Sequence, residues 1–262
     1  MEEKFANEIE SHVSQLKTEG WSVIEGVIPE DEVDAIREAV ETSEAEYQKF
    51  SQEHGRWARN VIAFMPSFAK HLAEPRLLGV VKELLGPQVR ISQTEYKIRP
   101  PHYELVRAYH SDFPYDLKQK WHIKQPFPSA VIGITTLWML SSFSTENGGT
   151  WIVPKTHLDL RNPRGENDGI DEFAPIPNEF QVEGSAGSVL VMDARIWHSN
   201  AANPDDKART AVVVRYAPWW LSLELFGVNQ ATFQAEVFNT FPEEVQVLYE
   251  HRIEGHESAL WA

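Results

Sequence analysis

The N-terminal third of the chain repeats its apolar residues at the spacing of helices. Between residues 2 and 17 the apolar positions recur every three or four residues, which predicts an amphipathic helix. A second such run, over 29–50, starts with proline and acidic residues, and a third, over 74–87, ends at glycine and proline. The stretch 20–28 alternates instead and predicts a strand. We therefore expect residues 1–87 to form helical support for the rest of the chain.

From residue 88 onward the pattern changes to short runs rich in valine, isoleucine, tyrosine and tryptophan. Clusters of proline, glycine, asparagine and aspartate separate these runs, as in strands joined by loops. Helices followed by many short strands indicate a β-sandwich or β-barrel with helices packed outside it. No domain boundary is visible, so we expect one domain over 1–262, with its core at 88–218 and a C-terminal extension at 219–262. The predicted strands are 88–98, 103–110, 130–140, 149–153, 180–183, 187–193 and 208–217.

Net charge and amino-acid composition argue against several classes of function. The formal net charge of −15 argues against a general binder of nucleic acid or anionic membranes, because its field repels phosphates. The chain has no cysteine, so any metal must bind to imidazole and carboxylate groups. The charged N-terminus lacks a hydrophobic signal core, and no apolar run reaches membrane-spanning length. These features favour a cytoplasmic protein with a small-molecule partner; they leave the oligomeric state open.

Three residues form a candidate metal site. His110 and Asp112 stand two apart in "RAYHSDF", and in an extended chain such residues point to the same side. His198 follows the predicted strand 187–193 and adds a second imidazole. Two neutral nitrogens and one carboxylate form the facial set that leaves three positions open on Fe(II). The short pattern at His110 and Asp112 alone fits a solvated strand end equally well, but His198 favours the metal site.

Arg209 opens the predicted strand 208–217, eleven residues after His198. A guanidinium is a planar cation that can hold a carboxylate through two parallel hydrogen bonds. Arg209 therefore suits the distal carboxylate of a dicarboxylic cosubstrate. The alternative is a surface salt bridge to Asp205 or Asp206.

Five stretches of the sequence together resemble a known family. They are "GWSVIEGVIPEDEVDAIR", "EPRLLGVVKELLGPQV", "YHSD", "TENGGTWIVPKTH" at 145–157, and "WHSN" followed by Arg209. In this order they resemble the phytanoyl-CoA dioxygenase-like branch of the Fe(II)/2-oxoglutarate-dependent oxygenases, over roughly residues 19–218. The stretch "YHSDF" also resembles ectoine hydroxylases, but the following loop does not, so that substrate is not transferred.

The resemblance implies a fold and a ligand set. The fold is a double-stranded β-helix, a jelly-roll barrel like that of cupins, with the metal inside its mouth. His110, Asp112 and His198 would hold Fe(II), and Arg209 would anchor the distal carboxylate of 2-oxoglutarate, with O₂ as the oxidant.

Further candidates surround this set. Gln93 and Lys97 lie four apart on the preceding strand and so face the same side, where related enzymes line the cosubstrate pocket. Asn200 occupies a position where the family often has a serine that contacts the cosubstrate. Trp138 is a candidate for the substrate pocket, with core packing as its alternative. His122 lies in a lysine-rich run and is either part of a lid that meets the substrate or part of a solvated loop.

The leading hypothesis is a dioxygenase that hydroxylates, or otherwise oxidises, an unactivated C–H bond of a small metabolite or natural-product intermediate and releases succinate and CO₂. Two alternatives use the same barrel. One is a cupin-like hydrolase or isomerase with another metal, which would not need Arg209. The other is a non-catalytic module that binds small molecules. The sequence does not identify the primary substrate, because loops set that choice.

Overall fold

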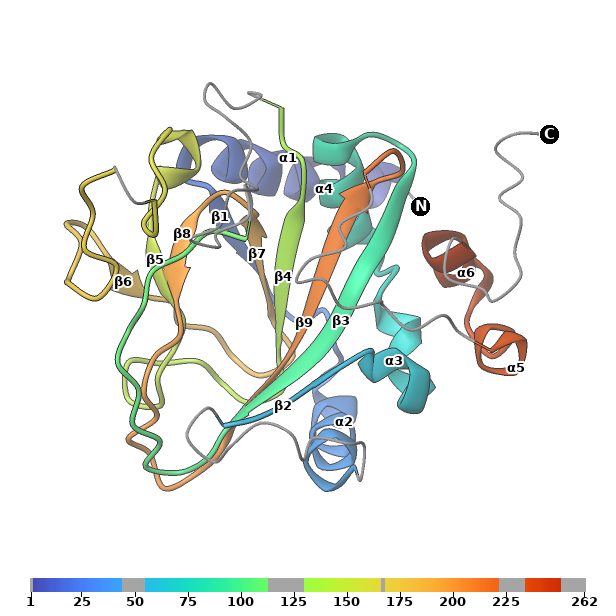
Figure 1. Cartoon of the computed structure of the whole chain (residues 1–262). Helices are drawn as coiled ribbons and strands as arrows, with labels where there is room; N and C mark the ends of the chain where they lie inside the picture. The colour runs from blue at the N-terminus through green and yellow to red at the C-terminus, as the bar shows by residue number, and fades with distance from the viewer. Residues whose placement is uncertain (1, 44–54, 113–129, 166–167, 222–233, 251–262) are drawn as a thin grey trace.

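The strands of the protein form two sheets. The computed structural model describes residues 2–43, 55–112, 130–165, 168–221 and 234–250. Six strands form one antiparallel sheet in the order β1-β7-β4-β9-β3-β2, and three form a second sheet in the order β6-β5-β8 (Figure 1). The strands are β1 Trp21–Ile24, β2 Arg56–Arg59, β3 Val89–Arg99, β4 Ile134–Met139, β5 Trp151–Val153, β6 Phe180–Gln181, β7 Val189–Asp193, β8 Trp197–Ser199 and β9 Arg209–Pro218.

The three predicted helical runs appear as α1, α2 and α4, although residues 44–50 of the second run lie outside the described residues. The carboxylate of Glu74 accepts a hydrogen bond from the Leu77 amide at 2.9 Å and so caps the start of α4. Gly86 ends this helix with a φ of 95°, which suits glycine. The helices are α1 Glu2–Glu19, α2 Glu30–Thr42, α3 Val61–Phe64, α4 Pro75–Leu85, α5 Ala235–Phe238 and α6 Glu243–Tyr249, with short 3₁₀ helices at Pro66–His71 and Thr156–Leu158.

The main hydrophobic core lies between the helices and one face of the six-stranded sheet (Figure 1). Side chains alternate along a strand, so the even-numbered residues of β9 point into this core. Val212, Val214 and Tyr216 are fully buried there. Trp138 of β4 joins them, and its ring meets Phe68 edge to face with the centroids 5.2 Å apart. We call this side of the sheet the helix face.

The opposite side of the six-stranded sheet, which we call the inner face, carries a second and smaller apolar cluster together with the β5–β8 region. Ala211 belongs to this cluster, so the odd-numbered residues Arg209, Val213 and Arg215 share its side of β9. The cluster consists of Met139, Phe143, Ile152, Val182, Leu190, Met192, Ile196 and Ala211.

The predicted strand over 103–110 does not form a ladder. Only two isolated bridges occur there, Tyr103 with Asn203 and His110 with His198. The backbone between them bonds to loop and side-chain groups instead, as when the Ala108 amide donates to the Ser199 hydroxyl at 2.9 Å. The short strands β2 and β8 were not predicted. Sheets with packed helices agree with the expected fold class. Among the described residues, no helix is both long and apolar enough to cross a membrane.

Candidate metal centre

Backbone pairing brings the two candidate histidines together. The His110 amide donates to the His198 carbonyl at 3.0 Å, and the His198 amide donates to the His110 carbonyl at 2.8 Å. This antiparallel bridge joins the end of the 103–110 segment to β8. The two rings consequently lie side by side, with their centroids 4.3 Å apart.

Each ring is oriented by the same kind of hydrogen bond. His110 Nδ1 lies 3.3 Å from the Ala108 carbonyl, and His198 Nδ1 lies 3.0 Å from the Ile196 carbonyl. A carbonyl oxygen only accepts, so both Nδ1 atoms carry the hydrogen. Nε2 of each ring is then the nitrogen with a free lone pair, as in metal-binding histidines whose other nitrogen donates to a carbonyl.

Asp112 completes the set. Its Oδ1 lies 4.0 Å from His198 Nε2, and His110, Asp112 and His198 each offer a ligand atom within 4.8 Å of the others. Two donors hold the carboxylate: Thr135 Oγ1 donates to Oδ2 at 2.6 Å, and Arg215 Nη2 donates to Oδ1 at 3.4 Å. Among the described residues, this is the group of histidine and acidic side chains that could hold a metal ion.

The charge states of these groups suit a divalent metal. Burial lowers the pKa of both His110 and His198. Burial raises the pKa of Asp112, but the charges of Arg215, His198 and His110 outweigh it and keep that pKa well below its usual range. At neutral pH the set therefore offers two neutral imidazoles and one carboxylate, which is the donor set that non-haem Fe(II) uses.

Arg215 connects Asp112 to a second buried carboxylate. Its Nη1 lies 3.1 Å from Glu95 Oε1, while its Nη2 reaches Asp112. Trp57 Nε1 donates to Glu95 Oε2 at 2.6 Å, and Lys97 Nζ lies 3.3 Å from Glu95 Oε1. The attraction of Asp112 and Glu95 outweighs burial and raises the pKa of Arg215. Arg215 is thus a buried cation that is paired with two carboxylates.

Arg209, at the other end of β9, has a different environment. Its side chain is buried, and its guanidinium stacks over the Phe143 ring at 4.5 Å. It makes no ion pair with any carboxylate in the part of the chain that the structure describes, Asp205 and Asp206 included. Burial and the charge of Arg99, its register partner on β3, lower the pKa of Arg209 to about 9. A buried cation in this state favours an anionic ligand.

The other cosubstrate candidates lie on or near the same inner face. Gln93 pairs in register with Arg215, and its Nε2 donates to Glu95 Oε2 at 3.2 Å, while its Oε1 has no hydrogen-bond partner among the described residues. Lys97 pairs in register with Ala211, between the two arginines, and its charge acts on the pKa of His198. Asn200 is half-buried directly after β8.

Of the two candidate substrate contacts, only Trp138 lies within the described residues, and it is on the other side of the sheet. Trp138 lies on the helix face of β4, whereas Thr135, which bonds to Asp112, is an odd-numbered residue of the inner face. Trp138 Nε1 donates to Thr136 Oγ1 at 3.0 Å, which satisfies its donor within the core. The structure therefore assigns Trp138 to core packing, the alternative considered for it. His122 lies outside the described residues.

Thr135, Glu95 and Arg215 were missed in the sequence. Each had a signal. Arg215 is a lone charge in the apolar run "AVVVRYAP", six residues after Arg209 and hence on the same strand face. Glu95 lies midway between Gln93 and Lys97 and shares their side. Thr135 is an ordinary strand residue whose role depends on a partner distant in sequence.

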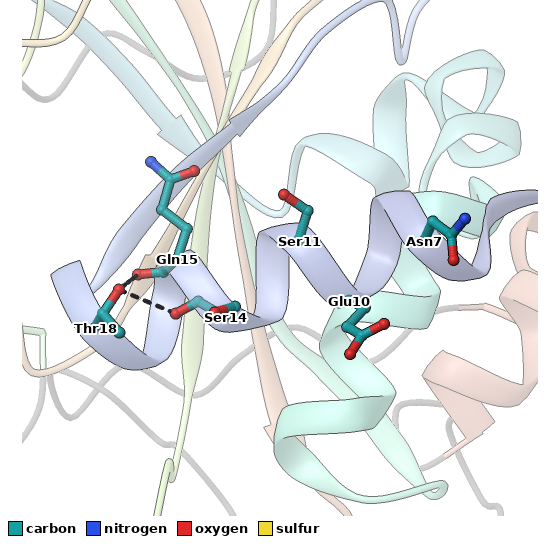
Figure 2. A pocket seen from close by; sticks show the side chains of 6 residues that line it. All are labelled: Asn7, Glu10, Ser11, Ser14, Gln15 and Thr18. Carbon is teal, nitrogen blue, oxygen red and sulfur yellow. Dashed lines mark hydrogen bonds between the residues drawn. The ribbon is translucent and has the colours of Figure 1, made fainter.

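A depression elsewhere on the surface offers no comparable chemistry. It runs along the polar side of α1, where Thr18 Oγ1 donates to the Ser14 and Gln15 carbonyls at 3.1 and 3.2 Å (Figure 2). Glu10 is its one ionisable lining residue, so the depression lacks the set of imidazole and carboxylate groups found at the candidate metal centre. Its lining consists of Asn7, Glu10, Ser11, Ser14, Gln15 and Thr18.

Comparison with known proteins agrees with this geometry. The chain is 26% identical over 220 residues to a dioxygenase, af480, of Aspergillus fumigatus, covering 79% of this chain and 66% of the relative, just under two thirds of its length. It is 22% identical over 260 residues to the ectoine dioxygenase of Bordetella parapertussis, covering 87% of this chain and 82% of that protein.

The fold is shared with a solved structure, that of HygX from Streptomyces hygroscopicus with nickel and 2-oxoglutarate bound. The TM-score is 0.62 at 21% identity, over 81% of this chain and 88% of HygX. The family model described as phytanoyl-CoA dioxygenase (PhyH) matches residues 16–211, three quarters of the sequence. This protein belongs to the phytanoyl-CoA dioxygenase family.

Proposed function

We propose that the protein is an Fe(II)- and 2-oxoglutarate-dependent dioxygenase that hydroxylates a C–H bond of a small molecule. The observation that carries the proposal is the grouping of His110, Asp112 and His198, together with a buried Arg209 on β9 that has no carboxylate partner among the described residues. Family membership and the dioxygenase relatives support the same reaction class. The cofactors are Fe(II), 2-oxoglutarate as cosubstrate, and O₂.

The fold part of the proposal is a closed double-stranded β-helix. The six-stranded and three-stranded sheets, together with the bridge from His110 to His198 of β8, support this part of the proposal. We infer one domain over 1–262, with 88–218 as the barrel core. A cytoplasmic location, and the absence of nucleic-acid and membrane partners, are likewise parts of this proposal.

The position of Arg209 on β9 supports it as the cosubstrate anchor. Arg215 and Thr135, register partners on β9 and β4, hold Asp112, so the metal end of the site lies near their level. Arg209 lies on the same face of β9 as Arg215, at the opposite end of the strand. Lys97, opposite Ala211, lies between the two ends and is a second contact in the proposal, with Gln93 beside it.

The protein residues have separate tasks in the reaction. When bound, Fe(II) with 2-oxoglutarate supplies the activation of O₂ that oxidises the substrate, while the cosubstrate leaves as succinate and CO₂. The Nδ1–H bonds to Ala108 and Ile196 fix the two imidazoles with Nε2 toward the metal. Asp112 supplies the one anionic ligand and leaves three positions open. Arg209 neutralises and orients the far carboxylate. Asn200 remains a candidate contact to the cosubstrate, and His122 a candidate substrate contact.

The two alternatives fit the geometry less well. A hydrolase or isomerase on this donor set has no use for a buried arginine without a carboxylate partner. A non-catalytic module has no use for a facial set in which both imidazoles are oriented by hydrogen bonds.

Succinate release tests the proposal directly. Purified protein, stripped of metal and reloaded with Fe(II), should convert 2-oxoglutarate slowly to succinate even without primary substrate. Protein reloaded with Zn²⁺ should not. Succinate formation that is absent with Fe(II), or equal with both metals, would contradict the proposal. Screening small metabolites for an increase in this rate would then identify the substrate class.

A further inference from the structure

Both oxygens of Asp112 have a hydrogen-bond donor from the inner face. Thr135 Oγ1 donates to Oδ2 at 2.6 Å, a short bond to a carboxylate. Arg215 donates to Oδ1 at a longer 3.4 Å. Thr135 and Arg215 are register partners on β4 and β9, so adjacent strands hold the two oxygens from one level of the sheet.

The two carboxylate oxygens of Asp112 are not equally available to a metal ion. Oδ1 is the oxygen that lies 4.0 Å from His198 Nε2, so it faces the histidines. Oδ2 is taken by the Thr135 hydroxyl. Thr135 is 2% exposed, so water cannot readily replace its hydroxyl as the donor. The β-branched threonine has few rotamers, which keeps that hydroxyl in place.

The number of oxygens that Asp112 contributes decides how the site can work. A carboxylate bound through one oxygen leaves three positions for a chelating keto acid and O₂, whereas a carboxylate bound through both oxygens leaves two. We propose that Thr135 is a positioning residue that ties up Oδ2 and so keeps Asp112 a ligand through Oδ1 alone. Arg215 supports this arrangement by holding the other side of the same carboxylate. The inference rests on the iron site of the proposed function.

Removing only the hydroxyl tests this role. Thr135→Val keeps the shape and β-branching of the side chain but frees Oδ2, and Thr135→Ser keeps the hydroxyl and serves as the matched control. The first readout uses Mn²⁺ alone as the probe, with water-proton relaxation reporting how many waters the bound ion carries. In Thr135→Val one of three open positions is lost, so the relaxation enhancement per bound Mn²⁺ should fall to about two thirds of the wild-type value. Thr135→Ser should match wild type.

The second readout is 2-oxoglutarate affinity for the anaerobic Fe(II) protein, followed by the charge-transfer absorption of the chelate. It should weaken at least about tenfold in Thr135→Val while the affinity for Fe(II) itself is kept, because the carboxylate still binds the metal. Thermal unfolding checks that each variant is folded, and Thr135→Ala repeats the test if the valine methyl is not accommodated.

Unchanged Mn²⁺ relaxation in folded Thr135→Val would overturn the proposal, as would a serine variant that behaves like the valine one. Loss of metal binding in Thr135→Val would also overturn it, because the hydroxyl would then be needed for ligation itself. The Mn²⁺ measurement contains no 2-oxoglutarate. Its result therefore tests the role of Thr135 separately from the proposed dioxygenase reaction.

Discussion

The two arginines of β9 occupy the same face of the same strand, yet their surroundings are opposite. Arg215 is held between Asp112 and Glu95, and these carboxylates raise its pKa. Arg209 is equally buried but contacts the Phe143 ring and lies beside another cation, Arg99, and its pKa falls to about 9. A buried arginine that already has its carboxylates stabilises a structure, whereas one without them is suited to an anion that arrives from outside.

Substitution of the three candidate metal ligands should cause the largest loss of activity. His110→Ala, Asp112→Ala and His198→Ala should each abolish Fe(II) binding and reduce succinate formation below detection, because each removes one of three ligands. Asp112→Ala also removes one of the two carboxylate partners of Arg215. Metal titration and circular dichroism together check this. Near wild-type turnover in any one of the three variants would remove that residue from the ligand set.

Substitution of the two arginines should change the free energy of unfolding in different ways. Arg215→Met leaves Glu95 and Asp112 buried without their shared cation, which should cost about 3–5 kcal/mol of unfolding free energy. Arg209→Met removes an unpaired buried charge, so its unfolding free energy should stay the same or rise by up to roughly 2 kcal/mol. Urea denaturation of metal-free protein measures both. Arg161→Met, at an exposed pair with Asp159, is a control that should change little. Equal destabilisation at Arg209 and Arg215 would show that Arg209 has a structural partner.

Arg209 should matter most for the cosubstrate. Arg209→Ala should raise the 2-oxoglutarate KM by about 10²-fold or more, since two charge-assisted hydrogen bonds are lost at about 1.5–3 kcal/mol each. Arg209→Lys should lose part of this, because an ammonium gives poorer geometry. Fe(II) affinity should hardly change in either variant. Steady-state succinate assays and metal titration give the two quantities, and an unchanged KM would assign the anchoring to Lys97 or Arg99.

Substitution of Lys97 should have a smaller effect on the 2-oxoglutarate KM than substitution of Arg209. This lysine already has Glu95 as a partner at 3.3 Å, so its contact with the cosubstrate competes with an existing ion pair. Lys97→Met should therefore raise the 2-oxoglutarate KM by only about 3- to 10-fold, or roughly 1 kcal/mol. The same succinate assay measures it. A rise as large as that of Arg209→Ala would make Lys97 the main anchor.

Much of this site could be predicted from the sequence, because its residues follow local rules. The side chains of His110 and Asp112 converge on one point even though no strand ladder forms there, since an extended backbone is enough to give that geometry. Residue type and order along the predicted strands added His198 and Arg209, and the resemblance to a family implied their roles toward Fe(II) and 2-oxoglutarate.

The other contacts of the site could not be predicted, because they depend on which side chains of each strand point to the inner face of the sheet. Both faces of β4 are buried, so the apolar pattern could not tell that Trp138 points to the helices and Thr135 to the metal site. The partners of Arg215 come from β3 and from the segment that ends at Asp112, far apart in sequence. Register between distant strands, which no local pattern encodes, fixed those contacts.

The role of Arg209 is isolated by the affinity of the anaerobic Fe(II) protein for two keto acids, 2-oxoglutarate and 2-oxopentanoate, in which a methyl group replaces the distal carboxylate. Wild-type protein should bind 2-oxoglutarate about 10²-fold more tightly or better, because Arg209 holds the extra carboxylate. Arg209→Ala should bind the two keto acids nearly alike. A preference for 2-oxoglutarate that survives in Arg209→Ala, or a wild-type protein that does not discriminate between the two, would contradict the account.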